Sequence, residues 1–155
     1  MKKKHLIITA ILLLITALIA FFHLRDRRQA PEGSLAVIFE ERETIVDPFT
    51  APSADVAGTI VNGKGQEKVI SEKGVTLSDV LSLAGFSEGE YSAVRVVSSD
   101  EHAAELSAEE IDPGKVAFLI KNTADDSSES IRLIVFGDPN AKRQIKNVVR
   151  IELTK

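Results

Sequence analysis

The chain has 155 residues, of which 44% are hydrophobic and 27% are charged, a composition typical of a globular domain rather than a disordered chain. The formal net charge is −4 and the chain contains no Trp and one Tyr, so neither a polyanion-binding surface nor a base-stacking platform is expected, and nucleic acid is not expected as a partner. The chain contains no Cys, which excludes disulfides, thiolate nucleophiles, iron–sulfur clusters and cysteine-ligated metals.

The first 34 residues predict a membrane anchor followed by a linker. After the basic residues 1–5, residues 6–22 carry no charge and would span roughly 25 Å as a helix, the short end of a membrane span. No Ala-x-Ala-like cleavage site follows this run, which favours an uncleaved signal anchor over a cleaved signal peptide. Residues 23–34 are expected to form a linker, because they include Pro31 and Gly33. We therefore expect a single-pass protein of the cell membrane whose domain, residues 35–155, lies outside the cytoplasm.

Short apolar runs separated by turn residues predict several strands in the first half of this domain. Between them Asn62-Gly63 is a strong hairpin signal, lengthened by Lys64-Gly65. The expected strands are Leu35–Phe39, Thr44–Val46 as an edge, Val56–Val61 and Glu67–Ile70, with a loop over Asp47–Asp55.

The clearest predicted helix covers Val75–Phe86. Thr76 with Asp79 three residues later has the pattern of a capping box. Apolar residues then recur at helical spacing from Leu77 to Ala84, which predicts one buried stripe. Gly85 suits the left-handed position that ends a helix.

The second half predicts further strands and one short helical turn. A single turn is expected over Ser107–Ile111, because Ser107 can cap it and Glu110 stands at the third position. The expected strands are Ala93–Ser98, His102–Leu106 and Lys115–Lys121, the last buried on both faces, with a loop over Asn122–Ser128. The fold class that follows is α+β: mostly β, with a mixed sheet and one main packed helix.

The stretch Ser130–Leu153 is expected to organise the domain. It predicts a buried strand, a Gly-Asp-Pro turn, a short basic segment and a final strand, two apolar strands against which earlier elements can pack. Gly137 permits positive φ, and successive turn amides can form an anion-binding nest. Near the turn lie Asp138, Lys142, Arg143 and Lys146, so the segment can capture a phosphate or another small anion. A plain hairpin whose basic residues serve solubility is the open alternative.

No catalytic or metal-binding residue is predicted. His102 is the one histidine of the predicted soluble domain, and a single histidine without neighbours at ligand spacing does not predict a metal site. The acidic run from Asp100 to Asp112 lacks the spacing of a calcium loop and is expected to be a solvated face. The chain has no Gly-x-Ser-x-Gly, no P-loop and no Gly-x-Gly-x-x-Gly motif.

Four segments, in this order, resemble the molybdopterin-binding oxidoreductase domain of the sulfite oxidase superfamily. They are GVTLSDVLSLAGF, AVRVVSSDEHAAELSAEEI, KVAFLIKN and IRLIVFGDPNAKRQIKNVVRIEL, and the resemblance runs from about Val56 to Leu153. It implies that family's fold and a pterin whose phosphate end lies on the loop after the Gly turn. The residues that match the cofactor side are Arg132, Gly137, Asp138, Lys142, Arg143 and Lys146.

The sequence departs from that family at two places. The protein cysteine that completes the coordination of molybdenum is missing, because the chain has none. The family's Ser-x-Asp-Gly-Tyr turn reads Ser98-Ser99-Asp100-Glu101-His102 here. The resemblance therefore implies a domain that binds molybdopterin or another small anionic ligand rather than one that catalyses oxo transfer, and whether it is an enzyme stays open.

Three alternatives remain open from the sequence. The domain can be a module of the cell envelope that binds a protein or glycan partner without ligand chemistry. A β-grasp domain is a structural rival, since a hairpin followed by TLSDVLSLAG suits such modules as well. A partner subunit of a redox complex is the third.

Overall fold

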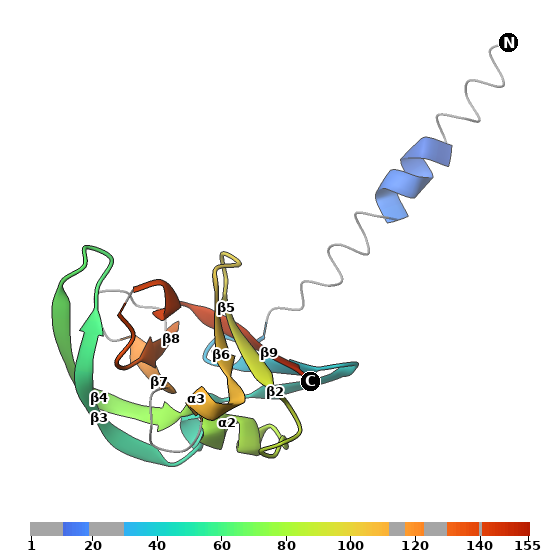
Figure 1. The fold of residues 1–155 in the computed structure, drawn as a ribbon. Helices are drawn as coiled ribbons and strands as arrows, with labels where there is room; N and C mark the ends of the chain where they lie inside the picture. The colour runs from blue at the N-terminus through green and yellow to red at the C-terminus, as the bar shows by residue number, and fades with distance from the viewer. Residues whose placement is uncertain (1–10, 19–29, 112–116, 123–129, 140) are drawn as a thin grey trace, which may run out of the picture.

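A computed structural model describes residues 11–18, 30–111, 117–122, 130–139 and 141–155 of the chain. Within these residues nine strands form two sheets, and the short helices α2 and α3 lie at one end of them (Figure 1). The predicted class, a mostly β domain of the α+β type with a mixed sheet, is confirmed.

The first sheet has five strands in the order β2-β1-β9-β5-β6. Its one parallel pair joins β1 to β9, the strand at its centre, and its other pairs are antiparallel. The bounds of these strands are β1 Leu35–Phe39, β2 Arg42–Val46, β5 Ala93–Ser98, β6 Ala103–Ser107 and β9 Val148–Thr154.

The second sheet has four antiparallel strands in the order β3-β4-β7-β8. Its bounds are β3 Ser53–Val61, β4 Glu67–Thr76, β7 Ala117–Asn122 and β8 Ser130–Val135. The predicted turn joins β3 to β4: the Asn62 side chain accepts hydrogen bonds from the backbone N–H groups of Lys64 and Gln66 at 2.9 and 3.0 Å. This long hairpin, green in Figure 1, extends beyond the rest of the sheet.

The four-stranded sheet buries apolar side chains on both of its faces. One face contributes Val75, Leu119 and Leu133 to the main core, which also includes α2 and the inner face of the five-stranded sheet. The other face carries a second cluster: Ile60, Ile70, Ile120 and Ile134, with Phe136 packed against them.

A glycine allows the two edge strands of this sheet to approach each other. A Cβ atom added to Gly58 on β3 would lie 2.6 Å from Cδ1 of Phe136, which follows β8. The edge strands β3 and β8 are not neighbours in the sheet, so this contact shows that the sheet curls around the second cluster.

Helix α2, Leu77–Leu83, forms as its capping pattern predicts. The Thr76 side chain accepts from the N–H of Asp79 at 3.0 Å, and Gly85 has φ +84° where the helix ends. The predicted start at Val75 was two residues too early, because Val75 and Thr76 still belong to β4 and pair with β7. The predicted turn of helix is α3, Ala108–Ile111, whose Glu110 carboxylate accepts from the N–H of Ser107 at 3.0 Å.

Three predictions about elements were wrong. Residues 47–55 are not all loop: η1, Pro48–Thr50, is a 3-10 turn, and β3 already begins at Ser53. The strand predicted to end at Ile70 continues to Thr76, since its partner β3 begins at Ser53 and pairs with it as far as Val75. The strands β8 and β9, expected as a joined core, belong to different sheets, and the connection between them, which includes η2 (Ala141–Arg143), crosses from one sheet to the other.

The predicted anchor lies partly outside the described residues. Residues 11–18 are helical, and their large apolar side chains are 48% to 66% exposed. Among the residues that the structure describes, no helix has the length and hydrophobicity needed to cross a membrane. Residues 1–10 and 19–29 lie outside the described part, as do most of the predicted loop 122–128 and the Pro113-Gly114 turn.

Candidate functional site

The candidate site is the connection between β8 and β9, which contacts the turn between β5 and β6. It begins at Gly137, whose φ of +72° is the left-handed conformation that the sequence predicts for this turn. The N–H of Ser99 donates to the carbonyl of Asn147 at 2.9 Å. Nε2 of His102 donates to the carbonyl of Lys142 at 3.2 Å. Two hydrogen bonds therefore join the connection to the β5–β6 turn.

The same connection is also hydrogen-bonded to β8. The side-chain amide of Gln144 accepts from the N–H of Val135 at 3.2 Å and donates to its carbonyl at 2.7 Å. The N–H of Leu133 donates to the carbonyl of Ile145 at 2.8 Å, and the Ile145 side chain is fully buried. The backbone of the candidate site is thus fixed from both sides.

Arg143 is bound by two carboxylates of the protein. Its Nε donates to Asp138 at 2.6 Å and its terminal nitrogen donates to Glu110 of α3 at 2.6 Å. Burial raises the pKa of Glu110, but the hydrogen bonds from Arg143 and Ser107 outweigh it and leave that pKa below its usual value. One guanidinium faces two carboxylates, so this part of the turn offers no net positive charge to an anion.

Two further predicted site residues are Arg132, on β8, and Lys146, on the connection. The N–H of Leu133, the residue after Arg132, donates to the carbonyl of Ile145, the residue before Lys146, so the backbone at these two positions is close. Nε of Arg132 is buried and has no hydrogen-bond partner among the residues that the structure describes. Lys146 is exposed and forms no ion pair with the residues described. A buried donor without a partner is uncommon and marks a place where a ligand or water can bind.

The β5–β6 turn carries its own polar network. The Ser98 hydroxyl donates to Asp100, and this bond with that from the N–H of His102 lowers the pKa of the Asp100 carboxyl. Glu101 has φ +67°, a conformation that favours glycine, and it is the position at which the resembled family has Gly. The Glu101 carboxylate accepts two hydrogen bonds from Arg150 at 3.1 and 2.6 Å, which offsets part of this strain.

The structure divides the six predicted site residues into three groups. Gly137, Asp138 and Arg143 lie in one turn, where Asp138 is buried and paired with Arg143. Lys142 and Lys146 are exposed on the surface of the connection. Arg132 lies on the neighbouring strand β8, on the face of the sheet that carries the second cluster.

Sequence reasoning missed the partners that hold these groups. Glu110 was interpreted as a cap of a helical turn, and its bond to Arg143, 33 residues away, has no local signal. The ion pairs of Glu152 with Arg95 and Arg150, at 2.7 Å each, were also missed. The register of β5 against β9 explains the first pair, because Arg95 stands opposite Glu152.

Within the described residues no three His, Asp or Glu side chains come together in a way that could hold a metal ion. A comparison of the chain with models of known protein families gives no match, and a search of curated proteins finds no relative.

Proposed function

We propose that the chain is a membrane-anchored, extracytoplasmic domain that resembles molybdopterin-binding oxidoreductases and binds a small anionic ligand, a phosphate-bearing pterin or another small phosphate, without catalysing oxo transfer. The observation that carries this proposal is the buried Nε of Arg132, which has no hydrogen-bond partner among the described residues. The exposed Lys146 lies close to it along the backbone, because Leu133 is bonded to Ile145.

An anion is the ligand class that these two residues favour. A guanidinium recognises phosphate and carboxylate oxygens with several parallel N–H donors, and a neighbouring ammonium adds a point charge. Arg143 does not serve this purpose in the proposal, because it already faces Asp138 and Glu110. The ligand's charge therefore lies at Arg132 and Lys146, and the Gly137 turn positions the connection that carries Lys146.

The phosphate end of a pterin fits this pair of cations, whereas the metal end lacks its protein ligand. The chain has no Cys, so no thiolate is present to complete the coordination of molybdenum. The positive φ of Glu101 supports the resemblance at the β5–β6 turn, because the family's pattern has Gly there and glycine is the residue that favours a positive φ.

The proposed anchor is residues 6–22, with the domain from residue 35 onward outside the cytoplasm. The helical residues 11–18 carry no charged side chain. Their exposed side chains are large and apolar apart from Thr16 and Ala17, as is typical of a surface in contact with lipid. Protease added to intact cells with a permeable outer layer should digest the domain. A domain that stays intact under these conditions, and is digested only after lysis, would refute the orientation.

Ligand binding is tested with the full-length chain in detergent. We expect pyrophosphate, titrated by calorimetry, to bind the wild type and to bind Arg132→Met and Lys146→Met at least about tenfold more weakly, a loss of about 1.4 kcal/mol. Lys64→Met, in the β3–β4 turn, is the matched control and should bind as the wild type does. A wild type that binds neither pyrophosphate nor phosphate would refute the proposal.

The same preparation tests the cofactor. Pterin fluorescence after oxidative release and molybdenum content by mass spectrometry report what the protein retains from cells. Pterin without molybdenum supports the proposal. Stoichiometric molybdenum would overturn the claim that the domain does not catalyse oxo transfer.

A further inference from the structure

Strand β3 forms an edge of the four-stranded sheet that no other described strand covers. Its nine residues, Ser53–Val61, pair with β4 on one side only. The hairpin that it forms with β4 extends beyond the rest of the sheet (Figure 1). A long edge strand presents a row of backbone N–H and C=O groups to which another strand can bond.

The other three sheet edges are shorter, and two of them carry charge. Strands β2 and β6 have five residues each and expose Glu43 and Glu105. Strand β8 is bonded to the connection that follows it, where the N–H of Leu133 donates to the carbonyl of Ile145. Short length, charge and a covering segment all discourage further pairing of an edge. Strand β3 lacks these protections: it contains no proline or lysine, and its one charged residue is Asp55.

The register of the hairpin shows which backbone groups of β3 face the open edge. The N–H of Asn62 donates to the carbonyl of Gln66 at 2.8 Å, so these two residues form a bonded pair. Bonded and non-bonded positions alternate along an antiparallel pair. The residues whose backbone groups point away from β4 are therefore Ser53, Asp55, Ala57, Thr59 and Val61. Among the described residues, no backbone hydrogen bond crosses this edge.

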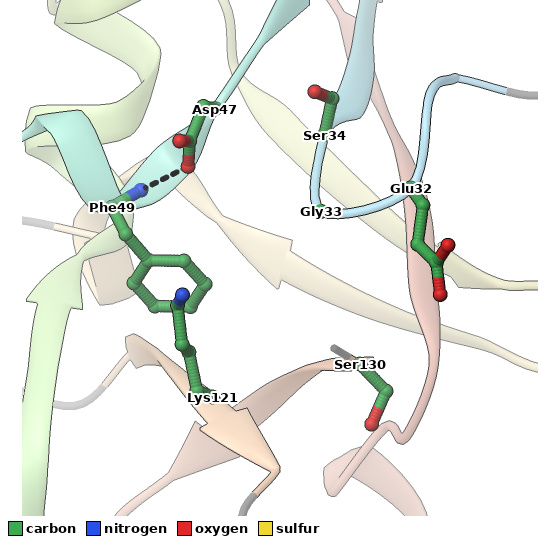
Figure 2. A pocket seen from close by; sticks show the side chains of 7 residues that line it. All are labelled: Glu32, Gly33, Ser34, Asp47, Phe49, Lys121 and Ser130. Carbon is green, nitrogen blue, oxygen red and sulfur yellow. Dashed lines mark hydrogen bonds between the residues drawn. The ribbon is translucent and has the colours of Figure 1, made fainter. Parts of the chain in front are cut away.

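The start of β3 is held in place by the turn η1. The Asp47 carboxylate accepts from the N–H of Phe49 at 2.9 Å (Figure 2). The Asp47 carbonyl accepts from the Thr50 hydroxyl at 2.8 Å, and Ala51, which follows the turn, is buried in the main core. The edge is therefore ordered before a partner binds, which lowers the entropic cost of association.

The sequence of β3 is self-complementary about Ala57. If two copies of the strand pair antiparallel with Ala57 opposite its equivalent, each larger side chain stands opposite a smaller one. These pairs are Val56 with Gly58, Ile60 with Ala54, and Val61 with Ser53. In this register odd-numbered residues also stand opposite odd-numbered residues, so the backbone groups that face the edge bond to one another.

The charge on the strand favours the same register. Asp55 then stands opposite Thr59 of the second copy, whose hydroxyl can donate to the carboxylate. A register centred on Asp55 would instead set two carboxylates opposite each other. Asp55 also lies 3.4 Å from Lys73 of its own chain, its partner on β4, so its charge is already balanced.

We propose that β3 is an interface between two copies of this chain, which pair antiparallel about Ala57 and join their four-stranded sheets into one. The proposal is independent of the anion site, because Arg132 lies on β8, at the other edge of the sheet.

The test places a charge on the twofold axis. Ala57 is exposed, so its replacement should leave the unfolding transition of the domain unchanged, and that transition is recorded for each variant. Sedimentation equilibrium of the full-length chain in detergent should show a dimer for the wild type. We expect Ala57→Lys and Ala57→Glu each to weaken it at least about fivefold, roughly 1 kcal/mol, because like charges then face each other. An equimolar mixture of the two variants should recover the dimer, because opposite charges then face each other.

The register is tested with introduced thiols, since the chain has no Cys of its own. Ala57→Cys should form a disulfide-linked dimer on oxidation, because the α-carbons of a bonded antiparallel pair lie about 5.5 Å apart. Ser71→Cys is the matched control: Ser71 is also exposed and pairs with Ala57 on β4. In the proposed dimer its two copies lie three strand spacings apart, about 14 Å, which is too far for a disulfide.

Three results would overturn the proposal. The first is a wild type that stays monomeric. The second is a dimer that neither charge variant weakens, because its contact then lies outside β3. The third is disulfide formation as efficient at Ser71→Cys as at Ala57→Cys. Crosslinking of Ala57→Cys in cells to a different protein, with none between copies, would assign the edge to another partner and likewise refute self-pairing.

Discussion

Arg143 donates through Nε to Asp138 at 2.6 Å, at a place where the Asp138 side chain is only 1% exposed. This bond joins two residues of the connection after β8. The second bond of Arg143, to Glu110, links the connection to α3. Arg143, one of the residues predicted to bind an anion, thus has a structural role. The proposed anion site therefore uses Arg132 on β8 and the exposed Lys146 of the connection instead.

Replacing Asp138 by Asn should destabilise the domain, because a buried carboxylate that accepts from a guanidinium is lost and Arg143 keeps only Glu110. We expect the free energy of unfolding to fall by about 1–3 kcal/mol. Denaturant unfolding followed by circular dichroism measures it. The control is Asp55→Asn, which removes an exposed pair with Lys73 and should change the free energy by less than about 0.5 kcal/mol. Equal losses in the two variants would contradict this account of Arg143.

Replacing Gly58 by Ala should destabilise the curl of the four-stranded sheet, since the added Cβ would lie 2.6 Å from the Phe136 ring. We expect a loss of about 1–3 kcal/mol from overpacking. The same change in a Phe136→Leu background should cost measurably less, because the smaller side chain leaves room, and a double-mutant cycle of unfolding free energies detects the difference. The control is Gly63→Ala, where the added Cβ has no atom within 4 Å. Additive effects of the Gly58 and Phe136 changes would argue against the contact.

Local signals predicted much of this fold. Thr76, Asp79 and Gly85 fix the ends of a helix through bonds that span only a few residues, so their pattern sufficed to predict α2. The Asn62 turn and the Ser107–Glu110 cap were predictable for the same reason.

The pairing of distant segments was not predictable from such signals. The two apolar strands around Gly137 were expected to form one unit, but their hydrophobicity does not specify a sheet, and β9 pairs with β1 and β5 instead. The candidate site shows the same limit. Its basic residues were found from their spacing, whereas the neutralisation of Arg143 depends on Glu110, which only the folded chain brings near.

Glu152 should make the stability of the domain depend on pH in the acid range. Burial raises the pKa of Glu152, but the hydrogen bonds from Arg150 and Arg95 outweigh it, so the folded pKa lies below the usual value. A lowered folded pKa means that the stabilisation is present above the pKa of the unfolded chain, about 4.3, and is lost as the pH falls through the folded pKa.

The variant that tests this is Glu152→Gln. Its deficit in unfolding free energy relative to the wild type should be about 1–2 kcal/mol at pH 7 and should shrink toward zero below about pH 3. Denaturant melts at a series of pH values give both curves. Glu67→Gln, at an exposed position of β4, is the control and should differ little from the wild type at pH 7. A deficit that stays constant down to pH 3 would contradict the role of the charged carboxylate.

Arg132→Met should stabilise the ligand-free protein. A buried N–H donor without a partner costs about 1–3 kcal/mol, and methionine keeps the length of the side chain without that donor. We expect the free energy of unfolding in phosphate-free buffer to rise by about 1 kcal/mol. Added pyrophosphate should stabilise the wild type and not the variant, because only the wild type binds it, so the difference between them should narrow or reverse.

The matched replacement is Arg95→Met, which removes one of the two arginine partners of Glu152 and should destabilise the protein with or without pyrophosphate. Thermal unfolding of the three proteins with and without the anion gives the complete comparison. If Arg132→Met lowers the stability of the protein in phosphate-free buffer, as Arg95→Met does, then Arg132 is a structural residue and its Nε is not a ligand-binding group. If it raises stability and abolishes the effect of pyrophosphate, the Arg132 guanidinium, with its buried Nε, is a binding group that the fold retains at a cost to its own stability.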